Sequence, residues 1–164
     1  MVDAVIRKAD SSDIESLCPL YFHFHEFHAK RVPERLVTLG PFSDFDNSEL
    51  VTKLKKILGD EQAVLLVAQV GGQIVGLAEA YIRQDKPHPE TKGYRYVHLQ
   101  SLMVREDFRG QGIGALLVQA AEDWARKHGA REIRLDTWEF SGDPVGFYEK
   151  MEYRTFRRQM VHVL

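Results

Sequence analysis

A glycine-rich turn between residues 109 and 114 carries the clearest chemical signal in this sequence. It reads Arg109-Gly110-Gln111-Gly112-Ile113-Gly114 and directly precedes an apolar helical pattern. Glycine has no Cβ and adopts a positive φ at little cost, so the backbone of such a turn can approach a ligand closely. The first turn of the following helix adds unpaired N–H groups and about half a positive charge from the helix dipole. The turn therefore predicts an anion site that suits a pyrophosphate.

A helix that starts at residue 113 must position this turn. Its apolar residues recur at intervals of three and four, which is one face of an α-helix. Gly129 follows three basic residues and provides a stop signal for the helix. The apolar positions are Ile113, Leu116, Leu117, Ala120, Ala121, Trp124 and Ala125.

Two other interpretations of the turn stay open. A dinucleotide-binding fingerprint tolerates Ala115 three residues after Gly112, and Asp136 could serve as its acid. The turn could also be purely structural. A P-loop is excluded because its lysine is absent.

Three stretches of the chain together resemble the GCN5-related N-acetyltransferase (GNAT) superfamily. Arg109-x-x-Gly112-x-Gly114 is similar to the family motif that binds the pyrophosphate and pantetheine of acetyl-CoA. Upstream, Leu99-x-x-Leu102-x-Val104 resembles the strand that pairs with the pantetheine arm. Downstream, Ser141-x-x-Pro144-x-x-Phe147-Tyr148 followed by Met151-x-Tyr153 resembles the second family motif. The similarity spans roughly Ile6 to Leu164.

The resemblance implies a fold, a co-substrate and a set of binding residues. The fold class is α/β, a GNAT-like α/β sandwich with a mixed, mostly antiparallel central sheet in a single domain, residues 1–164. The co-substrate is acetyl-CoA. The residues expected to bind it are Leu102, Met103, Val104, Arg109, Gly110, Gln111, Gly112, Ile113, Gly114, Ser141 and Tyr148.

The resemblance also names catalytic candidates. Tyr148 matches the motif tyrosine that points at the CoA sulfur, and we expect it to act as the acid. Three residues compete as the general base: Asp136, which precedes Tyr148 by the spacing seen in ribosomal-protein N-terminal acetyltransferases, Glu79 and His98. A backbone N–H near Val104 is expected to polarise the thioester carbonyl.

Three positions depart from the second motif. Ser141 replaces an asparagine, Pro144 an alanine and Glu152 a glycine. Serine can still cap a helix, and proline is welcome at a helix start. Glu152 is harder to explain, because glycine would relax the end of the helix.

Composition sets further bounds. A chain of 164 residues fits one domain, and a net charge of −2 gives no reason to expect nucleic acid or a membrane as a partner. Cys18 is the single cysteine, which fits a reducing compartment and is expected to be a core residue. No apolar run reaches the roughly 20 residues of a spanning helix, and we expect a cytoplasmic protein.

A cluster of three histidines invites a metal hypothesis. His23, His25 and His28 lie on one expected helix, but only the last two share a face, and the local sequence offers no further ligand. We therefore expect no metal. The aromatic helix is expected to line the acceptor pocket, with His25, Glu26 or His28 able to touch a polar substrate. Plain packing is an equal alternative.

The remaining pattern gives the element order β-α-α-β-β-β-α-β-α-β. Acidic residues Asp44 and Asp46 in the loop 32–47 could attract a cationic amine. The resemblance to the GNAT fold implies that the two strands on either side of the long helix, 94–104 and 131–138, run parallel and splay apart. Strands are predicted at 4–9, 63–70, 73–83, 94–104, 131–138 and 153–164, and helices at 14–30, 48–58, 113–127 and 144–151.

These features predict an N-acetyltransferase that moves an acetyl group to a primary amine by direct transfer in a ternary complex. The acceptor is a small molecule or, second, a protein N-terminus or lysine. The alternative is a non-catalytic acyl-CoA-binding regulatory module. A homodimer is possible.

Overall fold

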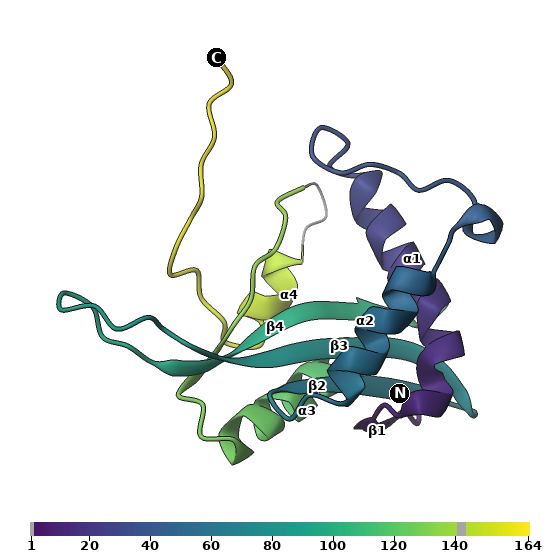
Figure 1. Cartoon of the computed structure of the whole chain (residues 1–164), viewed down its shortest axis with the longest axis horizontal. Helices are drawn as coiled ribbons and strands as arrows, with labels where there is room; N and C mark the ends of the chain where they lie inside the picture. The colour runs from purple at the N-terminus through teal and green to yellow at the C-terminus, as the bar shows by residue number, and fades with distance from the viewer. Residues whose placement is uncertain (1, 141–143) are drawn as a thin grey trace.

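A five-stranded sheet forms the centre of the protein, whose computed structural model describes residues 2–140 and 144–164. The strands lie side by side in chain order (Figure 1). Neighbours are antiparallel from β1 to β4, whereas β5 runs parallel to β4. The predicted mixed, mostly antiparallel sheet is confirmed. The strands are β1 (Val5–Lys8), β2 (Ala63–Val70), β3 (Gln73–Gln84), β4 (Arg95–Val104) and β5 (Glu132–Arg134).

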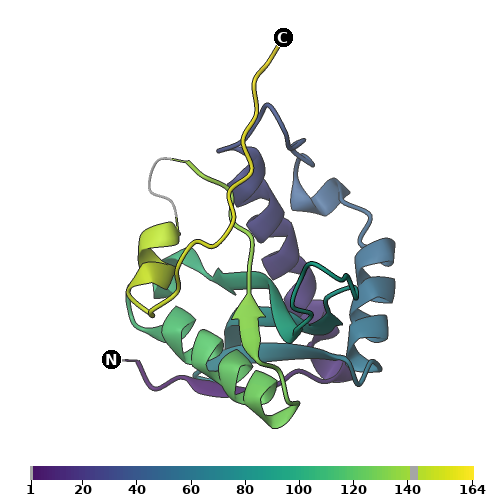
Figure 2. The ribbon, with the colours of Figure 1, turned by 90° about the vertical axis from the view of Figure 1, so that its left-hand side faces the viewer.

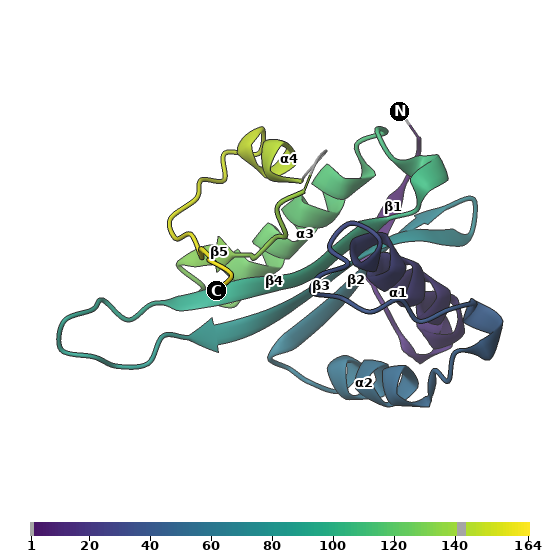
Figure 3. The same cartoon turned by 90° about the horizontal axis from the view of Figure 1, so that it is seen from above.

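Helices cover both faces of the sheet (Figure 3). Two helices, α1 and α2, lie on one face, and α3 lies on the other together with the short α4. The chain enters α1 through a capping box, in which Asp10 accepts from Ser12 and Asp13 accepts from the Asp10 backbone. The helices are α1 (Ile14–Ala29), α2 (Ser48–Leu58), α3 (Ile113–Lys127) and α4 (Val145–Glu149).

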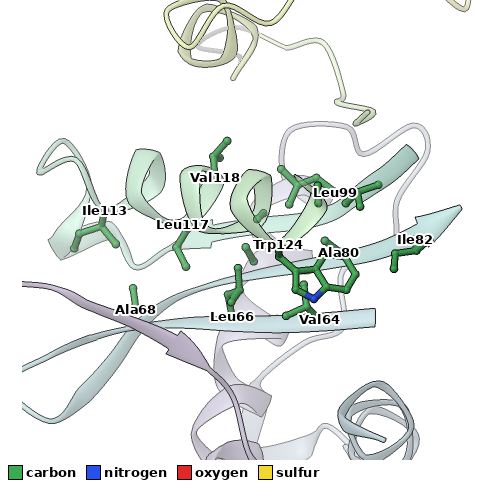
Figure 4. Close-up of a cluster of buried hydrophobic side chains, with 14 of the residues drawn as sticks. Val64, Leu66, Ala68, Ala80, Ile82, Leu99, Ile113, Leu117, Val118 and Trp124 are labelled. Carbon is green, nitrogen blue, oxygen red and sulfur yellow. The ribbon is translucent and has the colours of Figure 1, made fainter. Parts of the chain in front are cut away.

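Alternation along the strands produces a core on each face of the sheet. In β2, Leu66 points into the core beneath α3, whereas Leu65 points into the core beneath α1 and α2. Figure 4 shows the α3 core, where Leu117 and Trp124 lie over the sheet. Cys18 is buried in the other core, as predicted.

Glycines at positive φ end several elements where the sequence predicts a turn. Gly71 and Gly72 join β2 to β3 with φ of 55° and 83°. Gly129 follows α3 at φ 71°, and the backbone N–H of Ala130 donates to the carbonyl of Ala125 at 3.0 Å. This bond is the Schellman closure of a helix end.

Three predicted elements at the C-terminal end are corrected by the structure. The strand predicted at 131–138 is limited to β5, and the helix predicted at 144–151 is limited to α4. The strand predicted at 153–164 is wrong. Its composition favours a strand, but a strand needs a hydrogen-bonded neighbour, and this segment leaves the body of the protein (Figure 1) with Phe156 72% exposed and Val161 72% exposed.

Candidate active site

The site begins where β4 and β5 separate. Their parallel pairing runs from Tyr96 opposite Glu132 to His98 opposite Arg134 and then stops. Arg134 fixes this end of β5, because its guanidinium donates to both carboxylate oxygens of Asp85, at 2.7 and 2.8 Å, and stacks on Tyr96. The same contact lowers the pKa of the Asp85 carboxyl to about 2. The predicted parallel pairing is confirmed, and within the described residues the β5-facing edge of β4 has no strand beside it beyond His98.

A bulge in β4 changes which of its side chains face the α1–α2 side of the sheet. Leu99 packs in the α3 core and Met103 in the opposite core, although four residues of regular strand would keep them on one face. The register explains the change, since Ala80 pairs with Leu99 and Glu79 with Ser101, so that Gln100 is the extra residue. Ser101 therefore lies on the α1–α2 side.

The glycine turn has the geometry of an anion cradle. Gly110 and Gly112 have φ of 74° and 85°, and a Cβ built on either would meet no atom within 4 Å. Gly112 is the N-cap of α3, and no side chain caps the helix N–H groups there. Ile113 is 1% exposed and anchors the turn in the core. Free N–H groups beside open space fit a phosphate, so the residues present suit the pyrophosphate of acetyl-CoA.

The first and last residues of the glycine-rich turn, Arg109 and Gly114, contact other parts of the protein. The Arg109 Nε donates to the carbonyl of Val104 at 2.9 Å, and its guanidinium lies 4.8 Å from the ring centroid of Phe27 on α1. A Cβ on Gly114 would lie 3.4 Å from the ring of Phe147. This is an ordinary van der Waals distance, so Gly114 lies where α4 packs against α3 without glycine being required there.

The structure brings two of the three candidate bases together. His98 Nε2 on β4 lies 3.9 Å from a carboxylate oxygen of Asp136, which follows β5. The Asp136 side chain is 97% exposed, whereas that of His98 is 22% exposed. Burial lowers the pKa of His98 below its usual value, although Asp136 opposes this shift. The imidazole is therefore neutral at neutral pH and can accept a proton.

The candidate acid, Tyr148, lies on α4. Its ring centroid is 5.0 Å from that of Phe147 and 5.6 Å from that of Tyr153. Its hydroxyl has no hydrogen-bond partner among the residues that the structure describes. Burial raises the pKa of this phenol to about 12, so the proton stays in place at neutral pH.

One large cavity joins these groups. It measures about 2930 Å³ and extends from α1 across β4 to the segment after β5 and to α4. The glycines of the turn do not line it, Glu79 lies below its surface, and Ser141 lies outside the described residues. The predicted site residues on its wall are His98, Leu102, Met103, Val104, Arg109, Asp136 and Tyr148.

Comparison with known proteins identifies the family. The model of the acetyltransferase (GNAT) family matches residues 24–153. The chain belongs to this family. Among its relatives, the glucosamine 6-phosphate N-acetyltransferase of Trypanosoma brucei brucei is 30% identical over 162 residues, which cover 98% of this chain and 95% of that protein. The GNAT member is thus an acetyltransferase with acetyl-CoA as its co-substrate.

Solved structures share the fold of this GNAT acetyltransferase. A mutant protein from Bacillus halodurans superposes with a TM-score of 0.83 at 24% identity, covering 98% of this chain and 99% of the other. An aminoglycoside N-acetyltransferase in complex with CoA has a TM-score of 0.77 at 18% identity, covering 100% and 96%. In the described residues of the acetyltransferase, no helix has the length and apolar character needed to cross a membrane.

The third candidate base belongs to a buried network that sequence analysis missed. Glu79 is 0% exposed, and its two carboxylate oxygens accept hydrogen bonds from Tyr21 and Tyr81, each at 2.5 Å. Lys53 Nζ lies 3.1 Å from the same carboxylate. Burial and the carboxylate raise the pKa of both tyrosines, so both remain donors. The only sequence signal was a lone acid within the apolar run of β3.

The aromatic helix α1 lines the cavity, and each of its three candidate polar residues has a partner within the protein. His28 Nδ1 lies 2.8 Å from the carbonyl of Phe24. His25 Nε2 lies 2.6 Å from the carbonyl of Val37, and Glu26 accepts from the backbone N–H of Leu39 at 2.6 Å. These two contacts hold the loop that follows the helix. Among the described residues, no group of three or more histidine, cysteine or acidic side chains is placed to hold a metal ion.

Proposed function

We propose that this acetyltransferase transfers the acetyl group of acetyl-CoA directly to a primary amine of a small molecule. One observation carries the proposal. Tyr148, whose hydroxyl has no hydrogen-bond partner among the described residues, and His98, whose imidazole is neutral, both lie on the wall of one cavity. Direct transfer needs a proton acceptor for the amine and a proton donor for the sulfur within reach of one reacting centre.

The backbone supplies the proposed binding site for acetyl-CoA. The N–H groups at the start of α3, beside Gly110 and Gly112, take the pyrophosphate. The edge of β4 from Leu102 to Val104 has no strand beside it among the described residues, and the Val104 carbonyl there already accepts from Arg109. Its remaining backbone groups are offered to the amides of the pantetheine arm, as the family resemblance implies. His98 lies on the same strand as Leu102 and Val104 and on the wall of the same cavity. An acetyl group carried by a pantetheine arm along this edge would therefore point toward His98.

The acceptor amine must lose a proton before it attacks. At pH 7 this costs roughly 4.6 kcal/mol for an alkylamine with a pKa near 10.4 but only about 1 kcal/mol for an α-amino group near 7.8. His98 is the proposed base, because burial keeps it neutral, and Asp136 stabilises the imidazolium that forms. Glu79 is less suited to this role, since its oxygens are buried and already hydrogen-bonded.

Tyr148 is the proposed donor to the departing sulfur. Its pKa of about 12 lies about 3.5 units above that of a thiol, so complete proton transfer to a thiolate is uphill by about 5 kcal/mol. A hydrogen bond that strengthens as negative charge develops on the sulfur needs no such transfer. We therefore assign Tyr148 to stabilisation by hydrogen bonding.

Two features favour a small-molecule acceptor. The relative from Trypanosoma brucei brucei is named for an amino sugar phosphate, and the CoA-bound structural neighbour for an aminoglycoside. The cavity wall also carries the aromatic side chains of Trp138 and Phe140 and the acid Glu139. Such a wall suits a cationic, hydroxyl-bearing amine. A peptide N-terminus or lysine is the second acceptor class.

Calorimetric titration with acetyl-CoA tests the binding step. Gly112→Glu places negative charge beside the expected pyrophosphate and is expected to abolish binding. Gly72→Glu is the matched control, because Gly72 has φ 83° against 85° for Gly112 and equally open surroundings, but lies in a hairpin on another part of the sheet. Equal loss of affinity in both variants would attribute the effect to backbone strain and contradict the assigned site.

An acceptor screen that follows release of the CoA thiol tests the transfer step. Glucosamine 6-phosphate, an aminoglycoside, a simple polyamine and a short peptide with a free N-terminus cover the two acceptor classes. We expect turnover with at least one of the small-molecule amines. Turnover with the peptide alone would overturn the small-molecule assignment.

A further inference from the structure

Ser101 on β4 has a hydroxyl that the protein itself does not use. The residue is 9% exposed, and its side chain forms no hydrogen bond with any residue that the structure describes. Among those residues, every completely buried side-chain nitrogen or oxygen has a hydrogen-bond partner. Since the Ser101 Oγ has none, it is open to the cavity of about 2930 Å³, whose wall includes this residue. A hydroxyl held in this way on a cavity wall is a contact for a ligand.

The nearest acceptor on the same face explains why the hydroxyl is free. Glu79 lies directly opposite Ser101 in the pairing of β3 with β4. Its carboxylate oxygens already accept from Tyr21, Tyr81 and Lys53. The protein thus satisfies its buried acid with other donors and leaves the serine to the cavity.

Ser101 lies on the same face of the sheet as the proposed base. Glu79 pairs with Ser101 and Tyr81 with His98, and the two partners on β3 are two residues apart and share a face. This is the face that α1 and α2 cover, opposite α3 (Figure 2). The Cα atoms of Ser101 and His98 are therefore about 7 Å apart. Two hydrogen bonds that meet at one nitrogen span about 6 Å, so one acceptor nitrogen can contact both side chains.

The position of Ser101 along β4 is that of the reacting centre. It follows His98 and precedes Leu102–Val104, the edge assigned to the pantetheine arm. An ammonium acceptor gives up two protons as it becomes an amide, of which one ends on the CoA thiol and the other leaves through His98. A primary amine therefore keeps one N–H throughout the reaction, whereas a secondary amine keeps none.

We propose that the Ser101 hydroxyl accepts a hydrogen bond from the N–H that the acceptor nitrogen keeps, and that this contact selects primary over secondary amines. The inference rests on the proposed function, because it adds a contact at the same reacting centre. A secondary amine has an alkyl group in place of this N–H. The alkyl group would meet the hydroxyl and exclude water from it without replacing the hydrogen bond, which penalises the wrong substrate.

Kinetics with matched pairs of acceptors test the contact. The probes are glucosamine 6-phosphate and putrescine, each compared with its N-methyl derivative. The quantity to measure is the ratio of kcat/KM for the primary amine to kcat/KM for the N-methyl amine. Ser101→Ala is expected to lower this ratio about tenfold. Ser43→Ala is the matched control and should leave the ratio unchanged, because Ser43 is exposed, lies outside the cavity wall and donates to Asp44 at 3.1 Å.

Ser101→Thr and Ser101→Val separate the hydroxyl from the space that it occupies. The two new side chains have nearly the same shape, and only threonine has a hydroxyl. Threonine is expected to keep the ratio and valine to lower it about tenfold, with the affinity for acetyl-CoA within about twofold of the wild-type value in both. Equal ratios in these two variants would overturn the proposed contact.

Two further outcomes would also overturn the inference. An equal loss of kcat for both amines of a pair in Ser101→Ala would assign the hydroxyl to the thioester carbonyl instead of the acceptor nitrogen. Turnover of neither primary amine by the wild type would remove the inference as well, and if the other amines of the acceptor screen also failed, the proposed function would fall with it. Wild-type turnover with unchanged ratios in the variants refutes the inference alone.

Discussion

His98 Nε2 on β4 lies 3.9 Å from a carboxylate oxygen of Asp136, which follows β5 just beyond the point where the pairing of the two strands stops. Because burial lowers the pKa of His98, its catalytic form is present above that pKa and is lost as the pH falls through it. We expect kcat/KM to decline on the acidic side below about pH 6.5, the ordinary value for histidine. His98→Gln should reduce kcat/KM by about 10²-fold or more.

Asp136→Asn tests whether Asp136 affects the pKa of His98. The quantity to compare is the acidic limb of the pH profile, that is, the decline of kcat/KM at low pH. Asp136 raises the pKa of His98, so its removal should move the acidic limb to lower pH. The shift should stay below about one unit, because solvent screens this exposed carboxylate. Asp123→Asn, an equally conservative change on α3, is the control and should leave the limb in place. An unmoved limb in Asp136→Asn would show that the two groups are not coupled.

Tyr148→Phe is expected to reduce kcat by about 10²-fold, because the hydrogen bond to the departing sulfur is lost at the transition state. Affinity for acetyl-CoA should stay within about twofold of the wild-type value, since the phenol is assigned no ground-state bond to the co-substrate. Steady-state kinetics and calorimetry on the same preparation separate the two effects.

Tyr153→Phe provides a matched control for that variant. The ring of Tyr153 lies beside Tyr148, but its hydroxyl donates to Glu122 at 3.0 Å. Removing it should lower stability by about 1 kcal/mol and leave kcat nearly unchanged. Equal loss of kcat in both variants would point to disturbed packing of α4 rather than to the Tyr148 hydroxyl.

The buried Glu79 network predicts a stability effect. Glu79→Ala leaves Tyr21 without its acceptor and Lys53 without its counter-charge, and should lower the free energy of unfolding by about 3 kcal/mol in urea denaturation. Lys53→Met should cost less, because both tyrosine bonds to the carboxylate remain. Glu79→Gln should leave unchanged the decline of kcat/KM at acidic pH that is assigned to His98. If that limb disappeared while stability was retained, Glu79 would be the base.

Elements specified by local signals were predictable from the sequence to the residue. The helix Ser48–Leu58 and the strand Ala63–Val70 match their predictions, because periodicity, capping and the adjacent Gly71 all act within a few residues. The glycine-rich turn at residues 109–114 was also predictable from its local sequence. Gly110 and Gly112 have the positive φ that their residue type favours.

Relationships across the fold were not predictable from single positions. Glu79 and Tyr21 are 58 residues apart, and their contact depends on how α1 packs on β3. His98 and Asp136 were considered as separate candidates, because only the end of the β4–β5 pairing brings them together. The segment 153–164 was predicted as the last strand of the sheet, but it makes no strand pairing, and a strand requires a hydrogen-bonded neighbour.

Glu152 predicts a stabilising substitution. It is the only non-glycine residue with positive φ in the part of the chain that the structure describes, at 66°, and the second family motif has glycine here. The N–H of Tyr153 donates to the carbonyl of Tyr148 at 3.0 Å, which places Glu152 at the left-handed position of a Schellman closure. Glu152→Gly should therefore raise the free energy of unfolding by about 1 kcal/mol and Tm by about 2–4 °C.

Glu152→Ala separates backbone strain from any effect of the carboxylate. Alanine removes the charge but keeps the Cβ that opposes a positive φ, so this variant should show no comparable gain. Thermal and urea unfolding of the three proteins give the comparison directly. If Glu152→Ala raised the free energy of unfolding as much as Glu152→Gly, the destabilisation in the wild type would come from the glutamate carboxylate. The positive φ at this position would then cause no measurable strain.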